Sequence, residues 1–381
     1  MSLFLLLISH FYVDFCLGVW PIYKTWAHID LATAGLITGI AGFSAEVLQL
    51  FFGYMSDRGY RKKIMLFGIL ISSGVLLLPF AHSSLSLFAL IFCLMLGSSS
   101  FHPSGMGFAS RLFATKNRTI LFFTSGGALG LAFSQLIFSK TIVLFNGQIF
   151  PLLFPLLFLI PLVWRHPFPE ETAPTQRTNW REFFQPLKKE RRPLSLLYMA
   201  QVGSYGAQLT FLFLLPDLLR AKGYSDWLAK GGGHLSLVLG SLSSMLLIAF
   251  FLHKWSHKTL LFIGKTCGTI LIYFFLFAPP LPLPATLAIL ALIGGTSFQA
   301  TALITAWGHH IVPSHPSTVS GLLMGFAWCL SNLVPSLAGL FSRLLPYSPV
   351  ILPMKLIALI LPLSLVPLLL VPSKRAEQQA A

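Results

Sequence analysis

The chain has 381 residues, of which 55% are hydrophobic and only 10% are charged. A soluble protein of this length carries about a quarter charged residues, so the composition excludes a water-soluble globular protein and indicates that a bilayer is the solvent. The formal net charge is +15, from 26 Lys and Arg against 11 Asp and Glu. Because the basic residues lie in short turns between apolar runs, they favour retention of loops in the cytoplasm over binding of nucleic acid.

Apolar windows bounded by charge, proline or glycine predict twelve membrane spans. The first window has no basic residues before it and is expected to be a retained span rather than a cleaved signal peptide. The approximate limits of the spans are 3–23, 32–55, 63–81, 85–111, 118–142, 148–165, 194–219, 229–252, 259–278, 284–309, 316–343 and 348–371. The sequence therefore predicts an all-α integral membrane protein.

One long polar segment, RHPFPEETAPTQRTNWREFFQPLKKERRP, separates the sixth predicted span from the seventh. We expect an N-terminal six-helix half over 1–165, a cytoplasmic linker over 166–193, a C-terminal six-helix half over 194–372 and a short cytoplasmic tail over 373–381. Most Lys and Arg fall in inner loops when both termini are placed in the cytoplasm. This orientation predicts a multi-pass protein of the bacterial inner membrane.

Small residues recur at the spacing that lets helices pack closely in lipid. They form three sets, which we expect to be seams between helices and which can also be sliding surfaces: Gly35 and Gly39, then Gly126, Gly130 and Ser134, then Gly321 and Gly325.

The turn between the second and third predicted spans, GYMSDRGYRKK (53–63), concentrates charge in an otherwise apolar chain. It resembles the G-x-x-x-D-R-x-G-R-K loop of the major facilitator superfamily, at the place where that family has it. The resemblance implies a gating role, in which the acid latches the cytoplasmic side, for Gly53, Asp57, Arg58, Gly59, Arg61 and Lys62. The corresponding loop of the second half, LHKWSHK (252–258), lacks the acid and the glycines, so the latch is expected to be one-sided.

Three further segments, HFYVD (10–14), GSSSFHPSGMGFASRL (97–112) and VSGLLMGFAW (319–328), resemble the fosmidomycin-resistance branch of that superfamily. The resemblance implies secondary transport by alternating access, with a substrate path between the halves near the midplane. Members of the branch are known for drug efflux, usually coupled to protons. Three features depart from the pattern. Ser104 stands where the branch usually has Glu, and the span-four arginine of proton-coupled exporters has no counterpart between Leu85 and Gly107. In span five the segment GGALGLAFSQ (126–135) has Ser134-Gln135 in place of the Gly-Pro that closes the exporter-type motif.

Ionisable side chains inside a bilayer cost about 2.5–3.5 kcal/mol, so they need a partner, water or a function. His10 and Asp14 are one helical turn apart on the same face of span one. Such a pair can exchange a proton near neutral pH, or it can be a static pair that stabilises the span. Glu46 forms a polar stripe with Gln49 and Gly53 in span two. His10, Asp14 and Glu46 are our candidates for proton coupling.

Candidates for substrate contact are the polar side chains placed within other spans. His102 precedes Pro103, which is expected to bend span four, and three residues of span seven share one face at i, i+4 and i+7. The full set is His102, Gln201, Tyr205, Gln208, Gln299 and Asn332. Trp307 and Trp328 either line the path or anchor packing.

The sequence thus favours proton-coupled efflux of a drug or metabolite by a monomer, with a small-molecule substrate, protons and the lipid bilayer as its partners. Import or exchange of a metabolite on the same fold is the alternative. A membrane sensor and an intramembrane enzyme are less favoured, because no attached soluble domain and no clustered acids or nucleophile with a base are evident. The segment HHIVPSH (309–315) is interpreted as a loop, and no metal or organic cofactor is expected.

Overall fold

The computed structural model describes residues 1–112, 116–168, 185–251 and 255–372, and every regular element in these residues is a helix. The first group of elements is α1 (Ser2–Trp26), α2 (Leu31–Glu46), α3 (Gln49–Met55), η1 (Ser56–Tyr60), α4 (Arg61–Ser72), η2 (Ser73–Phe80), α5 (Ser84–Leu112), α6 (Lys116–Leu144), η3 (Phe150–Leu153) and α7 (Phe154–Arg165).

The second group follows the polar segment. It comprises α9 (Gln185–Lys189), α10 (Arg191–Ala221), η4 (Leu228–Gly232), α11 (Gly233–Phe251), α12 (His257–Phe277), α13 (Leu283–Ile293), η5 (Gly294–Phe298), α14 (Ala300–Ile311), α15 (Pro316–Ser320), η6 (Gly321–Phe326), α16 (Ala327–Ser331), α17 (Leu333–Leu344), α18 (Ile351–Ala358), α19 (Ile360–Leu363) and α20 (Leu365–Leu370).

Ten helical segments within the described ranges are long and apolar enough to cross a membrane. One of them, Leu31–Phe80, has 50 residues and holds two predicted spans, because Gly59 adopts a φ of 96° and breaks the helix there. Phe150–Arg165 is a shorter apolar helix at the sixth predicted span. The helices of the described residues therefore agree with the prediction of twelve crossings.

Several predicted features fall outside the described residues. These are most of the linker (169–184), His253 and Lys254 in the loop of the second half, and the tail at 373–381. The described end of the polar segment is helical, since α9 begins at Gln185 and α10 begins at Arg191, three residues before the predicted seventh span.

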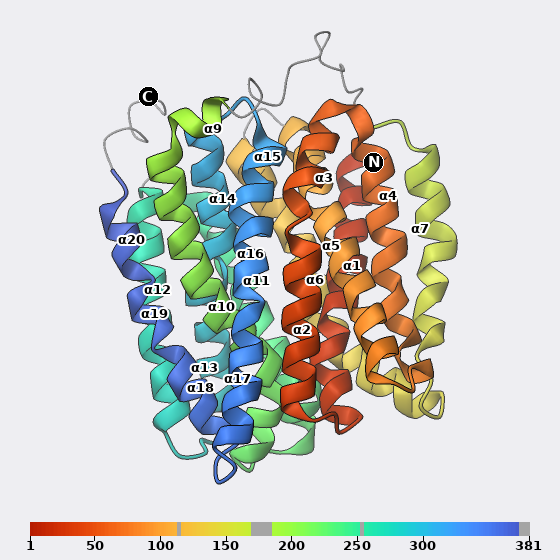
Figure 1. The fold of residues 1–381 in the computed structure, drawn as a ribbon, viewed down its shortest axis with the longest axis vertical. Coiled ribbons are helices and arrows are strands. Elements are labelled where there is room, and N and C mark those ends of the chain that lie inside the picture. The colour runs from red at the N-terminus through yellow and green to blue at the C-terminus, as the bar shows by residue number, and fades with distance from the viewer. Residues whose placement is uncertain (113–115, 169–184, 252–254, 373–381) are drawn as a thin grey trace.

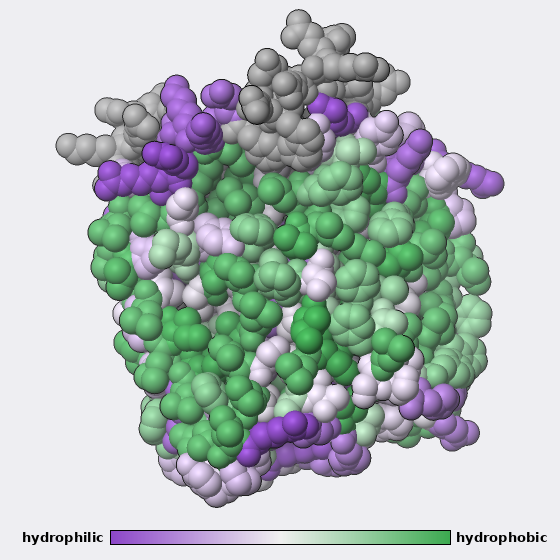
Figure 2. Space-filling view, viewed as in Figure 1, coloured by the Kyte–Doolittle hydropathy of each residue, from purple (hydrophilic) through white to green (hydrophobic). Residues whose placement is uncertain are grey.

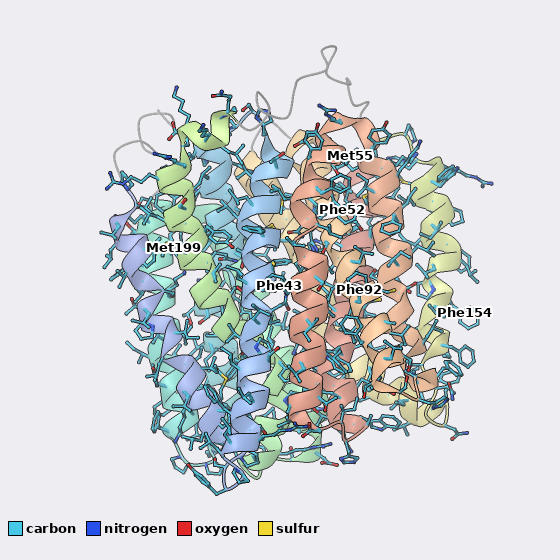
Figure 3. The ribbon with its side chains drawn as sticks, viewed as in Figure 1. Phe43, Phe52, Met55, Phe92, Phe154 and Met199 are labelled. Carbon is cyan, nitrogen blue, oxygen red and sulfur yellow. The ribbon has the colours of Figure 1, made fainter. Side chains whose placement is uncertain are left out.

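The helices run side by side, with α1–α7 on one side of the molecule and α9–α20 on the other (Figure 1). On the face shown in Figure 2, a broad apolar band covers the middle, and hydrophilic residues gather at the two ends. Phe154 projects from α7 at the outer edge and is 59% exposed (Figure 3). Such a band is what a bilayer requires, because helices satisfy their own backbone groups and present side chains to lipid.

The predicted small-residue seams are confirmed. Gly126 and Gly130 of α6 lie against the backbone of Leu7 and Phe11 in α1. Gly35 and Gly39 of α2 lie against Pro335 and Ser336 of α17, and Gly321 and Gly325 lie against Gln49 of α3. The last two seams join the first group of helices to the second, so close backbone contact is what holds the two groups together at these points.

Candidate functional site

The centre of the site is a cluster of two histidines and one aspartate. His10 and Asp14 lie midway along α1, and His102 reaches them from α5. The Nε2 atom of His10 is 3.3 Å from Oδ2 of Asp14, and Nε2 of His102 is 3.2 Å from Oδ1 of the same carboxylate. Both imidazoles are buried, and the Asp14 side chain is 16% exposed. One carboxylate therefore bridges two histidines from different helices.

Backbone carbonyls orient both imidazole rings. Nδ1 of His10 donates to the carbonyl of Phe123 at 2.7 Å, and Nδ1 of His102 donates to the carbonyl of Ser98 at 2.9 Å. A carbonyl only accepts, so Nδ1 of each ring carries a proton. The Nε2 atoms are consequently the ones left to face Asp14. The i, i+4 spacing predicted the first contact, whereas only packing of α5 on α1 supplies the second.

Glu46 adds a second buried acid at the end of α2. Its side chain is 2% exposed, and its Oε2 atom has no hydrogen-bond partner among the described atoms. His102, Ser98 and Ser99 of α5 are its electrostatic neighbours. A carboxylate in such a place is costly unless a cation or a proton accompanies it, which makes Glu46 part of the same charged centre.

Aromatic residues of the second helix group form the opposite wall. Tyr205 of α10 stacks on Trp328 of α16, with ring centroids 5.0 Å apart, and Trp328 meets His102 edge-on at 5.3 Å. His102 thus contacts the second group directly. The site lies between the two groups of helices, with ionisable side chains on one wall and aromatic ones on the other.

The remaining substrate candidates bond within the second group or at its seam. Gln201 donates to Thr301 of α14 at 2.6 Å, Gln208 donates to the carbonyl of Ser297 at 3.0 Å, and Gln299 donates to the carbonyl of Thr296 at 2.8 Å. Asn332 donates to the carbonyl of Trp328 and packs where α17 meets Gly42 of α2. The structure therefore brings His102 and Tyr205 to the central cluster through Trp328. Gln201 and Gln208 contact the helices that flank α10.

The predicted gating residues lie at one end of the molecule and reach the second helix group. Oδ1 of Asp57 pairs with Nη2 of Arg61 at 2.9 Å, and Thr318 of α15 donates to Oδ2 at 3.2 Å. Arg61 is fully buried, with its guanidinium 5.3 Å from the ring centre of Phe108. Asp57 therefore touches both groups of helices at once.

The other residues predicted to take part in gating support this turn. Gly59 takes the positive φ that ends the helix, Lys62 donates to the carbonyl of His166 at 2.9 Å, and Arg58 lies 4.5 Å from the ring centre of Tyr54. Gly53 is buried within α3. Burial lowers the pKa of nearby His315 below its ordinary value, against the opposing effect of the Asp57 carboxylate.

Two buried lysines carry contacts that sequence patterns did not reveal. Lys24 of α1 forms an ion pair with Asp217 of α10, at the end of the molecule opposite Asp57, and its ammonium lies 4.5 Å from the ring centre of Phe213. Lys265 of α12 donates to the carbonyl of Ala200 at 2.7 Å and to Ser204 at 2.9 Å. The position of Lys265 inside an apolar span indicates that it needs a partner, but the sequence does not show which residues bind it.

The chain resembles known proteins in sequence profile and in fold. Residues 3–336 match the Major Facilitator Superfamily. A variant of the nucleoside transporter NupG has a similar fold, with a TM-score of 0.69 at 14% identity, covering 97% of this chain and 98% of that one. A bacterial homologue of the human lysosomal transporter Spinster, in an inward-facing and unoccupied conformation, gives a TM-score of 0.71 at 14% identity, covering 99% and 96%. No curated protein matches the sequence.

The family match spans most of the chain, and the all-helical structure agrees with it. A multi-pass membrane protein of this kind binds a small-molecule substrate and is a transporter rather than an enzyme. The chain belongs to the major facilitator superfamily of secondary transporters.

Proposed function

We propose that this protein exports a small organic solute by alternating access and couples the export to protons. It works as a monomer in a bacterial inner membrane, with both termini in the cytoplasm and residues 1–165 and 194–372 as the two moving halves. The basic inner loops and the resemblance to the fosmidomycin-resistance branch support this assignment. No metal or organic cofactor is required for it.

The observation that carries the proposal is the place of the His10–Asp14–His102 cluster. It is buried between the two groups of helices, midway along α1, and it faces Tyr205 and Trp328 of the second group. Transporters of this kind bind substrate and coupling ion near the midplane between their repeats. Ionisable groups in such a place are functional by default, since the bilayer penalises them.

The chemistry of the two walls suits a solute that is aromatic or amphipathic. Tyr205 and Trp328 offer flat apolar faces, while Asp14 and Glu46 offer negative charge and His10 and His102 offer exchangeable protons. When the solute leaves the site, protons taken up from one side of the membrane neutralise Asp14 and Glu46. Gln201, Gln208, Gln299 and Asn332 remain candidates for polar contacts in another conformation of the transporter.

Contacts between the two groups at opposite ends of the molecule suit alternating access. Asp57 meets Thr318 at the end proposed to face the cytoplasm, and Lys24 meets Asp217 at the other end. Opening one end requires one of these contacts to break while the seams of α2 with α17 act as the pivot.

Import or exchange of a metabolite is the second candidate function. It is favoured by two departures from proton-coupled exporters: their span-four arginine has no counterpart between Leu85 and Gly107, and Ser134-Gln135 stands in place of Gly-Pro. In the structure Ser134 packs closely against Gly18 of α1, which is a seam contact rather than a hinge.

Proteoliposomes decide between these functions. The purified chain is first screened by thermal shift against antibiotics, sugars, amino acids, nucleosides and phosphorylated metabolites. Flux of the stabilising compound is then measured with and without a pH gradient, with a pH-sensitive dye inside the vesicles. We expect the gradient to drive flux and the dye to report proton movement, and we expect Asp14→Asn to abolish both effects while Asp226→Asn, at an exposed acid, leaves them unchanged.

Flux that ignores the gradient and survives Asp14→Asn would contradict proton coupling. Gradient-driven accumulation in the direction of proton entry would support import instead of efflux.

A further inference from the structure

The three residues at the centre of the site have the composition of a metal site. We infer that His10, Asp14 and His102 form a binding site for one divalent transition-metal cation of the Zn²⁺ class. One ligand atom from each of the three lies within 4.8 Å of the others. In the chain, α2, α3 and α4 all lie between His102 and the pair His10 and Asp14. No metal was expected from the sequence, because residues so far apart have no spacing typical of a metal site.

The hydrogen bonds of the two imidazoles leave their metal-binding atoms in place. Since Nδ1 of His10 and Nδ1 of His102 both donate to backbone carbonyls, each neutral ring has its lone pair on Nε2. Histidines that bind metals nearly always donate their other ring N–H to a carbonyl or carboxylate in this way. The structure thus shows the outer hydrogen bonds of a metal site around both rings.

The same tautomers create a conflict that a cation resolves. In neutral rings both Nε2 lone pairs would face carboxylate oxygens of Asp14, at 3.3 and 3.2 Å, which is acceptor against acceptor. Either a proton on each Nε2 or a single metal ion among the three groups removes this repulsion. Two ligand atoms bound to a tetrahedral Zn²⁺ at about 2.0–2.2 Å lie about 3.3–3.6 Å apart. Each of the two nitrogen–oxygen distances, to Oδ2 and to Oδ1 of Asp14, is close to this separation.

Two further features support a cation at this site: the buried carboxylate of Glu46 and the lack of a side chain at Gly127. The Glu46 carboxylate is buried with Oε2 unpartnered among the described atoms, and it interacts electrostatically with His102, so the centre holds two acids for one dication. Gly127 of α6 faces the cluster, where a Cβ atom would overlap both Oδ2 of Asp14 and Nε2 of His10. The absence of a side chain at residue 127 keeps space at the ligand atoms open.

The donor set selects the class of metal. Two imidazole nitrogens and one carboxylate suit Zn²⁺, Co²⁺, Ni²⁺ or Fe²⁺, whereas Mg²⁺ and Ca²⁺ prefer shells made of oxygen. Three protein ligands also leave a fourth position for water or for a group of the solute. The effect on transport rests on the proposed function: the metal takes the place of the coupling protons, so Zn²⁺ inhibits gradient-driven flux.

The test uses the full chain in detergent and cobalt as a spectroscopic probe. We expect one Co²⁺ per chain to give the visible absorption of a tetrahedral site, Zn²⁺ to displace it, and Mg²⁺ to leave it unchanged. X-ray absorption at the zinc edge of the loaded wild-type protein is expected to show two imidazoles and an oxygen ligand. A sulfur-containing or all-oxygen shell would overturn the inference without any variant.

Variants locate the binding. His10→Asn and His102→Asn keep an amide donor where Nδ1 was and remove Nε2, so each should weaken Co²⁺ binding by at least about tenfold. Gly127→Ala keeps all three ligands and should weaken binding comparably. Binding should be unchanged in His234→Gln, a buried histidine that donates to the Leu131 carbonyl, and in the double variant His309→Asn/His310→Asn.

The outcomes separate the two proposals. The structure places His309 and His310 in the last turn of α14 rather than in the loop that the sequence predicted. Loss of binding in His309→Asn/His310→Asn, with His102→Asn unaffected, would place the metal at this end of α14 and overturn the site. Cobalt binding with no gradient-driven flux would refute the proposed coupling and leave the metal site standing. Gradient-driven flux without any cobalt spectrum would refute the metal site and leave the proposed coupling standing.

Discussion

The Asp57 side chain makes two contacts, one within its own turn and one with the second helix group. Its carboxylate pairs with buried Arg61 on its own turn and accepts a hydrogen bond from Thr318 of the second helix group. A buried guanidinium without a counter-charge is expensive, so Asp57 stabilises the turn and the contact between groups together. Its place is the one that the family resemblance predicted for the latch.

Replacing Asp57 with Asn removes the charge and keeps the size. We expect the initial transport rate in proteoliposomes to fall about tenfold, because a charge-assisted hydrogen bond worth about 1.5–3 kcal/mol is lost from one state of the cycle. The amount of protein inserted in the membrane should be unchanged. Normal flux in Asp57→Asn, measured beside Asp226→Asn, would refute the latch.

At the scale of helices, stability depends on how closely backbones approach. Gly130 of α6 packs on the backbone of α1, where a Cβ atom would overlap the carbonyl oxygen of Phe11. Gly74 in η2 has open surroundings, since the nearest atom to its Cβ position is Cβ of Cys93 at 3.8 Å. The two glycines therefore share a residue type and differ in packing.

This difference in packing predicts that a glycine-to-alanine substitution changes the free energy of unfolding differently at the two positions. Gly130→Ala should destabilise the protein by about 1–3 kcal/mol, because α1 and α6 must separate. Gly74→Ala should leave stability unchanged or raise it by up to about 1 kcal/mol, because alanine restricts the unfolded chain. Thermal unfolding in detergent measures both, and equal effects at the two positions would contradict the seam.

At the scale of the whole molecule, the Lys24–Asp217 ion pair joins α1 to α10 with the lysine fully buried. Thr25 also donates to Asp217 at 3.3 Å. Removing one partner leaves a buried charge, whereas removing both leaves none. The effects of the two substitutions on the free energy of unfolding should therefore be strongly non-additive. The exposed Arg343–Asp30 pair also joins the two helix groups and is the matched comparison.

Asp217→Asn should lower the free energy of unfolding by about 3 kcal/mol, and the double variant Lys24→Met/Asp217→Asn should lose less. Arg343→Gln should cost under about 1 kcal/mol, because surface ion pairs are weak. Thermal unfolding is measured for the wild type, Asp217→Asn, Lys24→Met, the double variant and Arg343→Gln. A double variant as unstable as the sum of Asp217→Asn and Lys24→Met would show that the pair is not coupled.

The sequence by itself determined the class of protein, the spans and the position of the charged turn at 53–63. Composition decides the solvent, apolar length decides the helices, and local spacing places His10 beside Asp14 and Asp57 beside Arg61. These features depend on residues within a few turns of one another, so periodicity is sufficient to find them.

Only the tertiary structure decided which helices meet. It brings His102 to Asp14 and pairs Lys24 with Asp217. Tyr205 and Gln201 share one predicted face of α10, but they contact different helices. Tyr205 stacks on Trp328 of α16, whereas Gln201 donates a hydrogen bond to Thr301 of α14. Helical spacing shows which residues share a face of a helix, but it does not show which helix packs against that face. In lipid, the neighbouring helix is determined by close packing of small residues along whole helices.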